Sequence, residues 1–114
     1  MIKIVIQGPP IVQERPRKGR YGNFYDPSSK AKQRLSYELL VERHKMQRKP
    51  LTENVALEVV FYGLKKGDID NAIKALLDAG NKILWEDDKQ IVAIEAHVVR
   101  TDNHPRTVLC LKEI

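Results

Sequence analysis

The sequence predicts an α+β domain built from one mixed, mostly antiparallel sheet with its helices on one face. Four segments show the alternation of apolar residues that is typical of strands, and two segments show helical spacing. The helical segments separate the first three strands, whereas the last two strands follow each other across a short turn. A chain of 114 residues is long enough to bury one core. We therefore expect one domain over residues 1–114 with the element order β-α-β-α-β-β.

The first predicted strand covers residues 1–7, because Ile2, Ile4 and Ile6 share one face there. The glycine and two prolines that follow end this strand. The second strand covers residues 53–62, which alternate in the same way. Both strands therefore offer one apolar face to a common core.

The first helix is predicted over residues 27–48, since Asp26 and Pro27 suit a helix start and Pro50 marks its end. The second helix is predicted over residues 69–81. Its apolar residues fall on one arc, and its carboxylates fall on the opposite face together with a lysine. The helices therefore pack on the sheet through one side only.

Two further strands are predicted over residues 90–100 and 106–112. Both alternate, and a turn-like segment with Asp, Asn and Pro joins them. We expect them to pair as an antiparallel hairpin.

The segment from Ile11 to Tyr25 has no period and mixes cations, glycines and aromatic residues, so it is predicted to be a loop or an arm. Its cations could neutralise phosphates, and its aromatic rings could stack on unpaired bases. A flexible, solvated loop is the alternative. The residues concerned are Arg15, Arg17, Lys18, Arg20, Tyr21, Phe24 and Tyr25.

The formal net charge of +5 is unevenly distributed along the chain. Residues 1–50 hold 12 Lys and Arg against 4 Asp and Glu, whereas residues 51–114 hold 8 against 11. A basic half favours a polyanionic partner such as nucleic acid, and an acidic half favours a cation such as a metal ion. An ordinary solvated surface is the alternative.

The single Cys110 excludes an internal disulfide framework. No signal peptide or membrane-spanning run is recognisable. We therefore expect a cytoplasmic protein without a membrane partner.

Two pairs of acids flank the second predicted helix. Asp68 and Asp70 stand at its start, and Asp87 and Asp88 follow its end. Carboxylates hold hard divalent cations, which stabilise the charges that develop in phosphodiester cleavage. Lys74 shares the helix face of Asp70 and could reach a phosphate oxygen. The pattern indicates a site for Mg²⁺, with Mn²⁺ as an alternative ion, if the helix packs so that both pairs meet.

Each of these residues also has a plain structural interpretation. Asp70 could cap the helix, and Lys74 could be a solvated partner of Asp70 or Asp78. The acids at 86–88 could form a polar turn before a strand. The remaining metal-ligand candidates lack the spacing of a zinc site; they are His44, His97, His104 and Cys110.

The stretch from Gly67 to Val92 combines Asp-x-Asp-Asn, a lysine three residues after the asparagine, and an Asp-Asp pair before a strand. Gly8-Pro-Pro, Arg15-Pro-Arg and Tyr25-Asp-Pro accompany it. In these features the sequence resembles the RusA family of Holliday junction resolvases. The resemblance implies a RusA-like fold over most of the chain.

By position, the resemblance implies that Asp68, Asp70 and Asp88 bind the catalytic metal, with Asp87 as a neighbouring acid and Lys74 as a basic residue at the site. It also implies a Mg²⁺-dependent homodimer that cuts two opposed strands of a four-way DNA junction. The residues expected to contact DNA are Arg15, Arg17, Lys18, Arg20, Lys66 and Asn71.

The predicted function is therefore a structure-selective endodeoxyribonuclease that resolves four-way junctions by paired symmetric nicks in recombination and repair. In its mechanism, water activated at the metal attacks the phosphodiester in line. Two alternatives stay open. One is a non-catalytic nucleic-acid-binding module, and the other is a nuclease for different branched DNA such as flaps.

Overall fold

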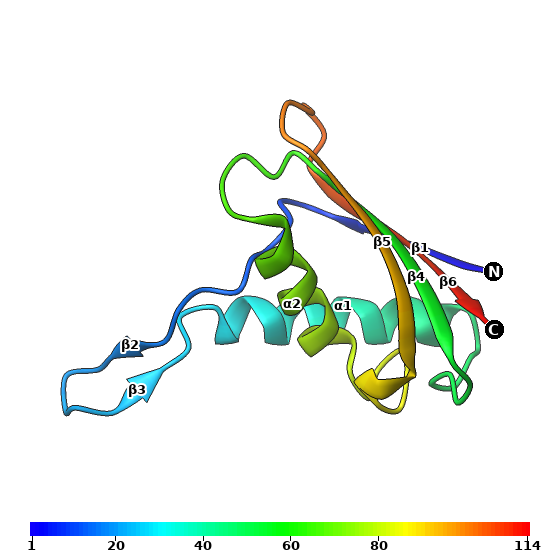
Figure 1. The fold of residues 1–114 in the computed structure, drawn as a ribbon, viewed down its shortest axis with the longest axis horizontal. Coiled ribbons are helices and arrows are strands. Elements are labelled where there is room, and N and C mark those ends of the chain that lie inside the picture. The colour runs from blue at the N-terminus through cyan, green and yellow to red at the C-terminus, as the bar shows by residue number, and fades with distance from the viewer.

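Four long strands form one mixed sheet in the computed structural model, which describes residues 1–114 (Figure 1). They are β1 (Ile2–Gln7), β4 (Val55–Tyr62), β5 (Ile91–Val99) and β6 (Arg106–Glu113), in the spatial order β1-β6-β4-β5. Strand β6 runs antiparallel to both β1 and β4, whereas β4 and β5 are parallel. Helices α1 (Ser29–Lys45) and α2 (Ile69–Gly80) lie on the same side of the sheet. The α+β prediction and its element order are confirmed.

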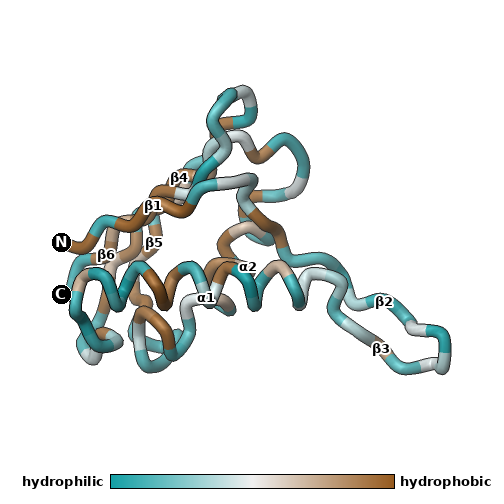
Figure 2. Tube along the Cα trace, turned by 180° about the vertical axis from the view of Figure 1, so that it is seen from behind, coloured by the Kyte–Doolittle hydropathy of each residue, from teal (hydrophilic) through white to brown (hydrophobic).

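The core lies between the sheet and the two helices because alternate strand residues point toward the helices. The inward residues of β4, Leu57, Val59 and Phe61, are almost fully buried. Helix α2 contributes Ala72 and Leu76 from its apolar arc. Burying one large aliphatic or aromatic side chain stabilises a fold by about 1.5–3 kcal/mol. Figure 2 shows this core as brown stretches in the sheet, with the segment around β2 and β3 mostly teal and white.

The predicted hairpin between the last two strands is wrong, because β4 lies between β5 and β6. Strand β4, helix α2 and strand β5 form a βαβ unit, which places β5 parallel beside β4. The six residues from Arg100 to Pro105 then cross the end of β4. At about 3.3 Å per extended residue, they easily span two strand spacings of about 4.8 Å each.

Helix α1 begins at Ser29, two residues later than predicted. Asp26 accepts a hydrogen bond from the backbone N–H of Ser28 at 2.9 Å, so its carboxylate still closes the turn that leads into the helix. The helix ends at Lys45 rather than at residue 48. Leu39 is its fully buried residue.

The end of α2 is set by close packing against Trp85, which is fully buried. A Cβ atom on Gly80 would lie only 2.7 Å from the Trp85 ring, so the ring needs a glycine there. The chain then makes the short 3₁₀ helix η1 (Asp88–Gln90) and enters β5. The indole of Trp85 therefore belongs to the core.

The segment predicted as a loop or arm contains two short antiparallel strands, β2 (Arg17–Lys18) and β3 (Phe24–Tyr25). This arm projects away from the sheet and helices in Figure 1. Neither strand contributes to the core, since the residues of both are exposed. Neither helix combines the length and the apolar character that crossing a membrane requires.

Candidate active site

The start of α2 is held in place by the loop before it. Gly67 adopts a φ of +105°, a conformation that favours glycine, and a Cβ there would lie 2.9 Å from Val12. The Arg100 guanidinium donates to the carbonyl oxygens of Gly67 at 2.8 Å and of Leu64 at 3.3 Å. These contacts fix the position of Asp68 at the start of the helix.

Asp68 is the N-cap residue of α2, and Asp70 lies in its first turn. The Asp68 carboxylate makes no capping hydrogen bond, and both side chains are exposed. The positive end of the helix dipole favours negative charge here by about 0.3–1 kcal/mol. The two carboxylates consequently point into solvent with their oxygen atoms free.

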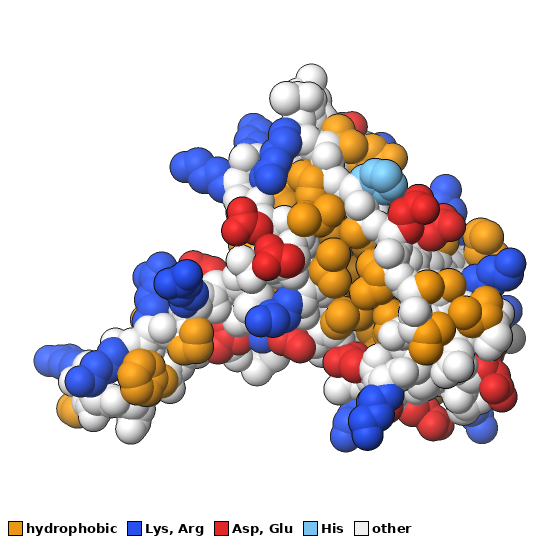
Figure 3. Space-filling model, in the orientation of Figure 1, with side chains coloured by type: hydrophobic (Ala, Val, Ile, Leu, Met, Phe, Trp, Pro, Cys, Tyr) orange, Lys and Arg blue, Asp and Glu red, His pale blue; other side chains and the backbone are white.

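These carboxylates open into a polar cleft of about 690 Å³ between α2, α1 and the root of the arm. No hydrophobic residue lines it. Figure 3 shows the acidic side chains of this region beside several cations. The lining residues are Gln13, Glu14, Arg15, Pro16, Lys32, Asp68, Asp70, Asn71, Lys74 and Asp78.

Lys32 joins three parts of the chain at the wall of this cleft. Its Nζ atom donates to Gln13 Oε1 at 2.6 Å and contacts Asp26 Oδ2 at 2.7 Å and Asp78 Oδ2 at 3.1 Å. The backbone N–H of Gln13 also donates to the carbonyl oxygen of Asn71 at 2.9 Å. The arm root is thus tied to both α1 and α2.

The charges of this cluster are mutually stabilised. The hydrogen bond from Lys32, followed by those from Ser28, holds the pKa of Asp26 far below its usual range. Burial lowers the pKa of Lys32, but the hydrogen bonds to Asp26 and Asp78 outweigh this effect and raise it. Asp78 is therefore engaged with Lys32, whereas Lys74 on the same helix face is exposed and forms no ion pair with Asp70 or Asp78.

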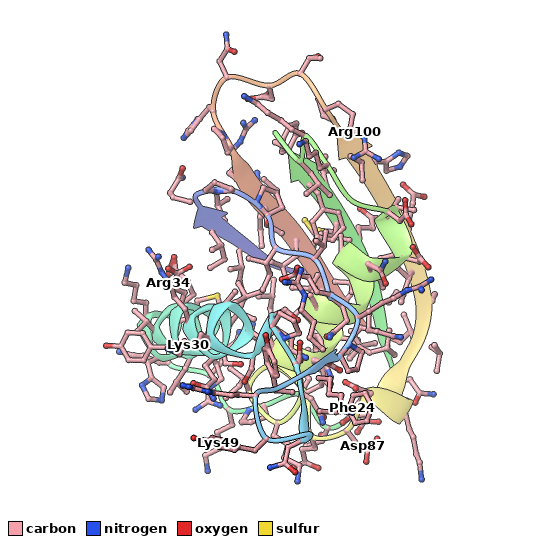
Figure 4. The ribbon with its side chains drawn as sticks, turned by 90° about the vertical axis from the view of Figure 1, so that its left-hand side faces the viewer. Phe24, Lys30, Arg34, Lys49, Asp87 and Arg100 are labelled. Atoms are coloured by element: carbon pink, nitrogen blue, oxygen red, sulfur yellow. The ribbon has the colours of Figure 1, made fainter.

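Asp87 and Asp88 lie beyond the opposite end of α2. The helix has 12 residues, so its ends are about 18 Å apart. In Figure 4, Arg100 and Asp87 lie at opposite ends of β5. Arg100 is the residue that binds the loop before Asp68. One chain therefore does not bring both acidic pairs together.

Both of these acids have local structural contacts. Asp88 Oδ1 accepts a hydrogen bond from the buried Trp85 Nε1 at 2.7 Å. The Asp87 carboxylate accepts from the backbone N–H of Lys89 at 2.8 Å, and the Gln90 side chain accepts from the backbone N–H of Asp87 at 2.7 Å, which caps η1. The interpretation of residues 86–88 as a polar turn before a strand describes their role within one chain.

The residues expected to contact DNA fall into two groups. Arg15 and Asn71 line the cleft itself. Lys66 is exposed in the loop before α2, and the cations from 17 to 20 lie on the arm. Sequence reasoning missed Lys32, because its partners are distant in sequence and no local pattern predicts their meeting.

A divalent ion at this site would be held by oxygen donors. Within one chain, no group of three or more Asp, Glu, His and Cys side chains is close enough to hold a metal. Mg²⁺, however, is commonly bound by one or two carboxylates, with water and substrate phosphates completing its octahedron. Asp68 and Asp70 fit that requirement.

An exposed carboxylate pair in a wholly polar cleft beside a basic arm defines a site suited to a polyanionic substrate and a hard cation. Comparison with known families identifies the chain within this class. The model of the endodeoxyribonuclease RusA family matches residues 7–112. The chain therefore belongs to the RusA endodeoxyribonuclease family, whose nucleases depend on divalent metal ions.

The chain is also similar to an uncharacterized protein, YqaN, of Bacillus subtilis (strain 168). The two are 27% identical over an alignment 139 residues long, which covers 99% of this chain and 96% of YqaN. The similarity extends over both proteins almost completely. It assigns no activity beyond that of the family.

Proposed function

We propose that this protein is a Mg²⁺-dependent endodeoxyribonuclease that resolves four-way DNA junctions by paired symmetric nicks during recombination and repair. The observation that carries the proposal is the polar cleft, where the free carboxylates of Asp68 and Asp70 meet Lys74 and Arg15. Membership of the RusA family supports the same assignment.

Asp68 and Asp70 would hold the ion at the start of α2. When bound, Mg²⁺ would lower the pKa of a coordinated water and neutralise charge on the scissile phosphate. Lys74 lies one turn along the helix and would donate to a non-bridging phosphate oxygen. Arg15 would bind a neighbouring phosphate and so align the strand across the two carboxylates.

A homodimer would supply the acid that one chain lacks. Strand β5 lies at the edge of the sheet. It begins directly after η1, whose first residue is Asp88. It ends beside the loop that leads to Asp68, because the N–H of Gly63 donates to the carbonyl oxygen of Val99 at 2.7 Å. Antiparallel pairing of β5 with its copy about a two-fold axis would bring Asp88 of the partner subunit toward that loop. Two complete sites would then face two DNA strands.

An apolar patch supports β5 and α2 as the dimer interface. Ile94 is 41% exposed, Val92 53% and Ile69 38%, and the partly buried Ile73 follows Ile69 by one turn of α2. Figure 3 shows these elements covered by a continuous hydrophobic area. A contiguous exposed apolar area of this kind marks a protein interface.

The function is tested with a strand-labelled four-way junction, a flap and a linear duplex of matched sequence, each incubated with protein and Mg²⁺. The proposal predicts paired nicks in the junction, little cleavage of the duplex, and none in EDTA. Preferred cleavage of the flap would assign a different branched substrate. Junction binding without nicking under Mg²⁺ and Mn²⁺ would favour a non-catalytic binding module.

A further inference from the structure

The arm is a narrow hairpin whose tip is closed by a glycine turn. The N–H of Gly19 donates to the carbonyl oxygen of Asn23 at 2.6 Å, and that of Gly22 donates to the carbonyl oxygen of Gly19 at 3.1 Å. Gly22 has a φ of +84°, which suits the turn to glycine. The arm is therefore an ordered, two-stranded element.

Three of its side chains are aromatic and unusually exposed for their size. Tyr21 is 87% exposed, Phe24 75% and Tyr25 50%. None of the three rings packs against the core, although Tyr25 lies beside Gly19 within the arm. Tyr21 and Phe24 are therefore available to a surface that meets the arm from outside.

The strand register mixes aromatic rings and cations on both faces of the arm. Arg17 lies opposite Tyr25, and Lys18 lies opposite Phe24. Because directly opposite residues of an antiparallel pair share a face, each face carries one ring beside one cation. Figure 3 shows hydrophobic and basic side chains interleaved along the arm. A partner must therefore offer both flat apolar surfaces and negative charge.

The base of the arm is fixed beside the cleft. Lys32 clamps both of its roots, through Gln13 on one side and Asp26 on the other, and the same Nζ atom binds Asp78 on α2. The direction in which the arm leaves the domain is thus coupled to the helix that carries Asp70. What the arm contacts is consequently set relative to the cleft.

We propose that the arm is a base-stacking probe for the branch point, an inference that rests on the proposed nuclease function. Tyr21 and Phe24 stack on the base faces that the branch point leaves without a stacked neighbour, while Arg17, Lys18 and Arg20 bind the flanking phosphates. A linear duplex offers no free base faces, because its bases are already stacked on one another. The arm therefore favours branched over linear DNA.

The experiment compares wild-type protein with a Tyr21→Ala/Phe24→Ala double variant, in EDTA so that the strands stay intact. The probes are a four-way junction with 2-aminopurine beside the branch and a linear duplex with the same base in mid-strand. Tyr37→Ala is the matched control, because Tyr37 is 66% exposed but lies on α1. Phe24→Trp on the Tyr21→Ala background tests rescue by another stacking ring.

Wild-type protein is expected to change the 2-aminopurine emission at the branch, and the double variant is not. The junction Kd of the double variant should rise about tenfold or more, with duplex affinity within about twofold. Tyr37→Ala should behave as wild type, and Phe24→Trp on the Tyr21→Ala background should retain most of the junction affinity. The melting temperatures should agree, because the substituted rings are exposed.

Equal weakening on junction and duplex, or no weakening at all, would overturn the stacking role. So would conversion of a dimer to a monomer in the double variant, because the arm would then clasp a second copy of the chain. If the wild-type protein never nicks the junction in Mg²⁺, the nuclease proposal fails by itself. The emission difference between wild type and double variant still decides what the arm does.

Discussion

The two ends of α2 carry similar acidic pairs in different surroundings. At its start, Asp68 and Asp70 are exposed and free of capping hydrogen bonds, inside a polar cleft. Beyond its end, Asp87 caps η1 and Asp88 binds the indole of a buried tryptophan. A pair of neighbouring aspartates therefore does not by itself define a role. Within one chain, the contacts of each carboxylate distinguish one whose oxygen atoms are free to bind an ion from one that already accepts a hydrogen bond.

The largest effect is expected from Asp70→Asn at the start of α2. The substitution removes a ligand for the ion, so junction cleavage should fall by about a thousandfold, equivalent to roughly 4 kcal/mol of transition-state stabilisation. Junction binding should persist or strengthen, because repulsion of phosphate is reduced. Single-turnover nicking and gel-shift affinity measure the two properties. Glu58→Gln, on the outer face of the sheet, is the control.

An Asp70→Asn variant that still cuts at the normal rate would refute the assignment of Asp70 as a ligand of the catalytic ion. A variant whose melting temperature also falls would indicate a structural role for Asp70. Neither result is expected, since the side chain is exposed.

The contribution of the Asp88–Trp85 hydrogen bond, beyond the end of α2, is tested by comparing Asp88→Ala with Asp88→Asn. Alanine leaves the buried Trp85 N–H without its acceptor, so the free energy of unfolding should fall by about 1–3 kcal/mol. Asparagine retains an oxygen acceptor and should keep most of the stability. Urea unfolding at fixed pH measures both variants.

Asp88→Asn should nevertheless be inactive, because the proposed site uses Asp88 in cleavage as well as in the hydrogen bond to Trp85. If both variants unfold at the same urea concentration as wild type, the hydrogen bond to Trp85 contributes nothing and the contrast between the helix ends weakens.

A smaller effect distinguishes the paired acid Asp26 from the free acids. Because Lys32 depresses the folded-state pKa of Asp26 below its ordinary value of 3.8, the pair stabilises the fold fully above that pH. This contribution is lost as the pH falls through the folded-state pKa. Wild-type stability should therefore fall more steeply below pH 4 than that of Asp26→Asn.

Thermal unfolding between pH 7 and pH 2 checks this expectation, with Asp70→Asn as the comparison. Parallel pH curves for wild type and Asp26→Asn would show that the ion pair does not contribute. The raised pKa of Lys32 predicts the opposite dependence in alkali, where stability is lost as the pH rises above 10.5 toward and through the folded-state value.

Most elements of this fold were predictable because their signals are local. Alternation identifies β1 and β4, and helical spacing identifies α2 within a residue of its ends. The pairing of the last strands was not predictable in the same way. A six-residue connection suits either a hairpin or a crossing over β4, and only the packing of the whole sheet chooses between them.

The residues of the candidate site that lie on α2 were predictable from the sequence, whereas the contacts that other segments make with them were not. Asp70, Asn71, Lys74 and Asp78 lie on one face by helical geometry, and the structure gathers them in one cleft. Lys32 was missed because Gln13, Asp26 and Asp78 meet it only in the tertiary fold. The separation of Asp88 from Asp68 was equally hidden, since it depends on the direction in which α2 runs.

A mixing experiment tests directly whether a catalytic site joins Asp68 and Asp70 of one subunit to Asp88 of the other. Asp70→Asn and Asp88→Asn proteins are assayed alone and after exchange of subunits in equal amounts, on the labelled junction with Mg²⁺. Each variant alone should be inactive.

The mixture should regain about a quarter of the wild-type sites, since random exchange makes about half the dimers mixed and each has one intact site. These dimers should nick only one strand of each junction. A mixture as inactive as its two components, after subunit exchange has been verified by mass spectrometry, would contradict the shared site.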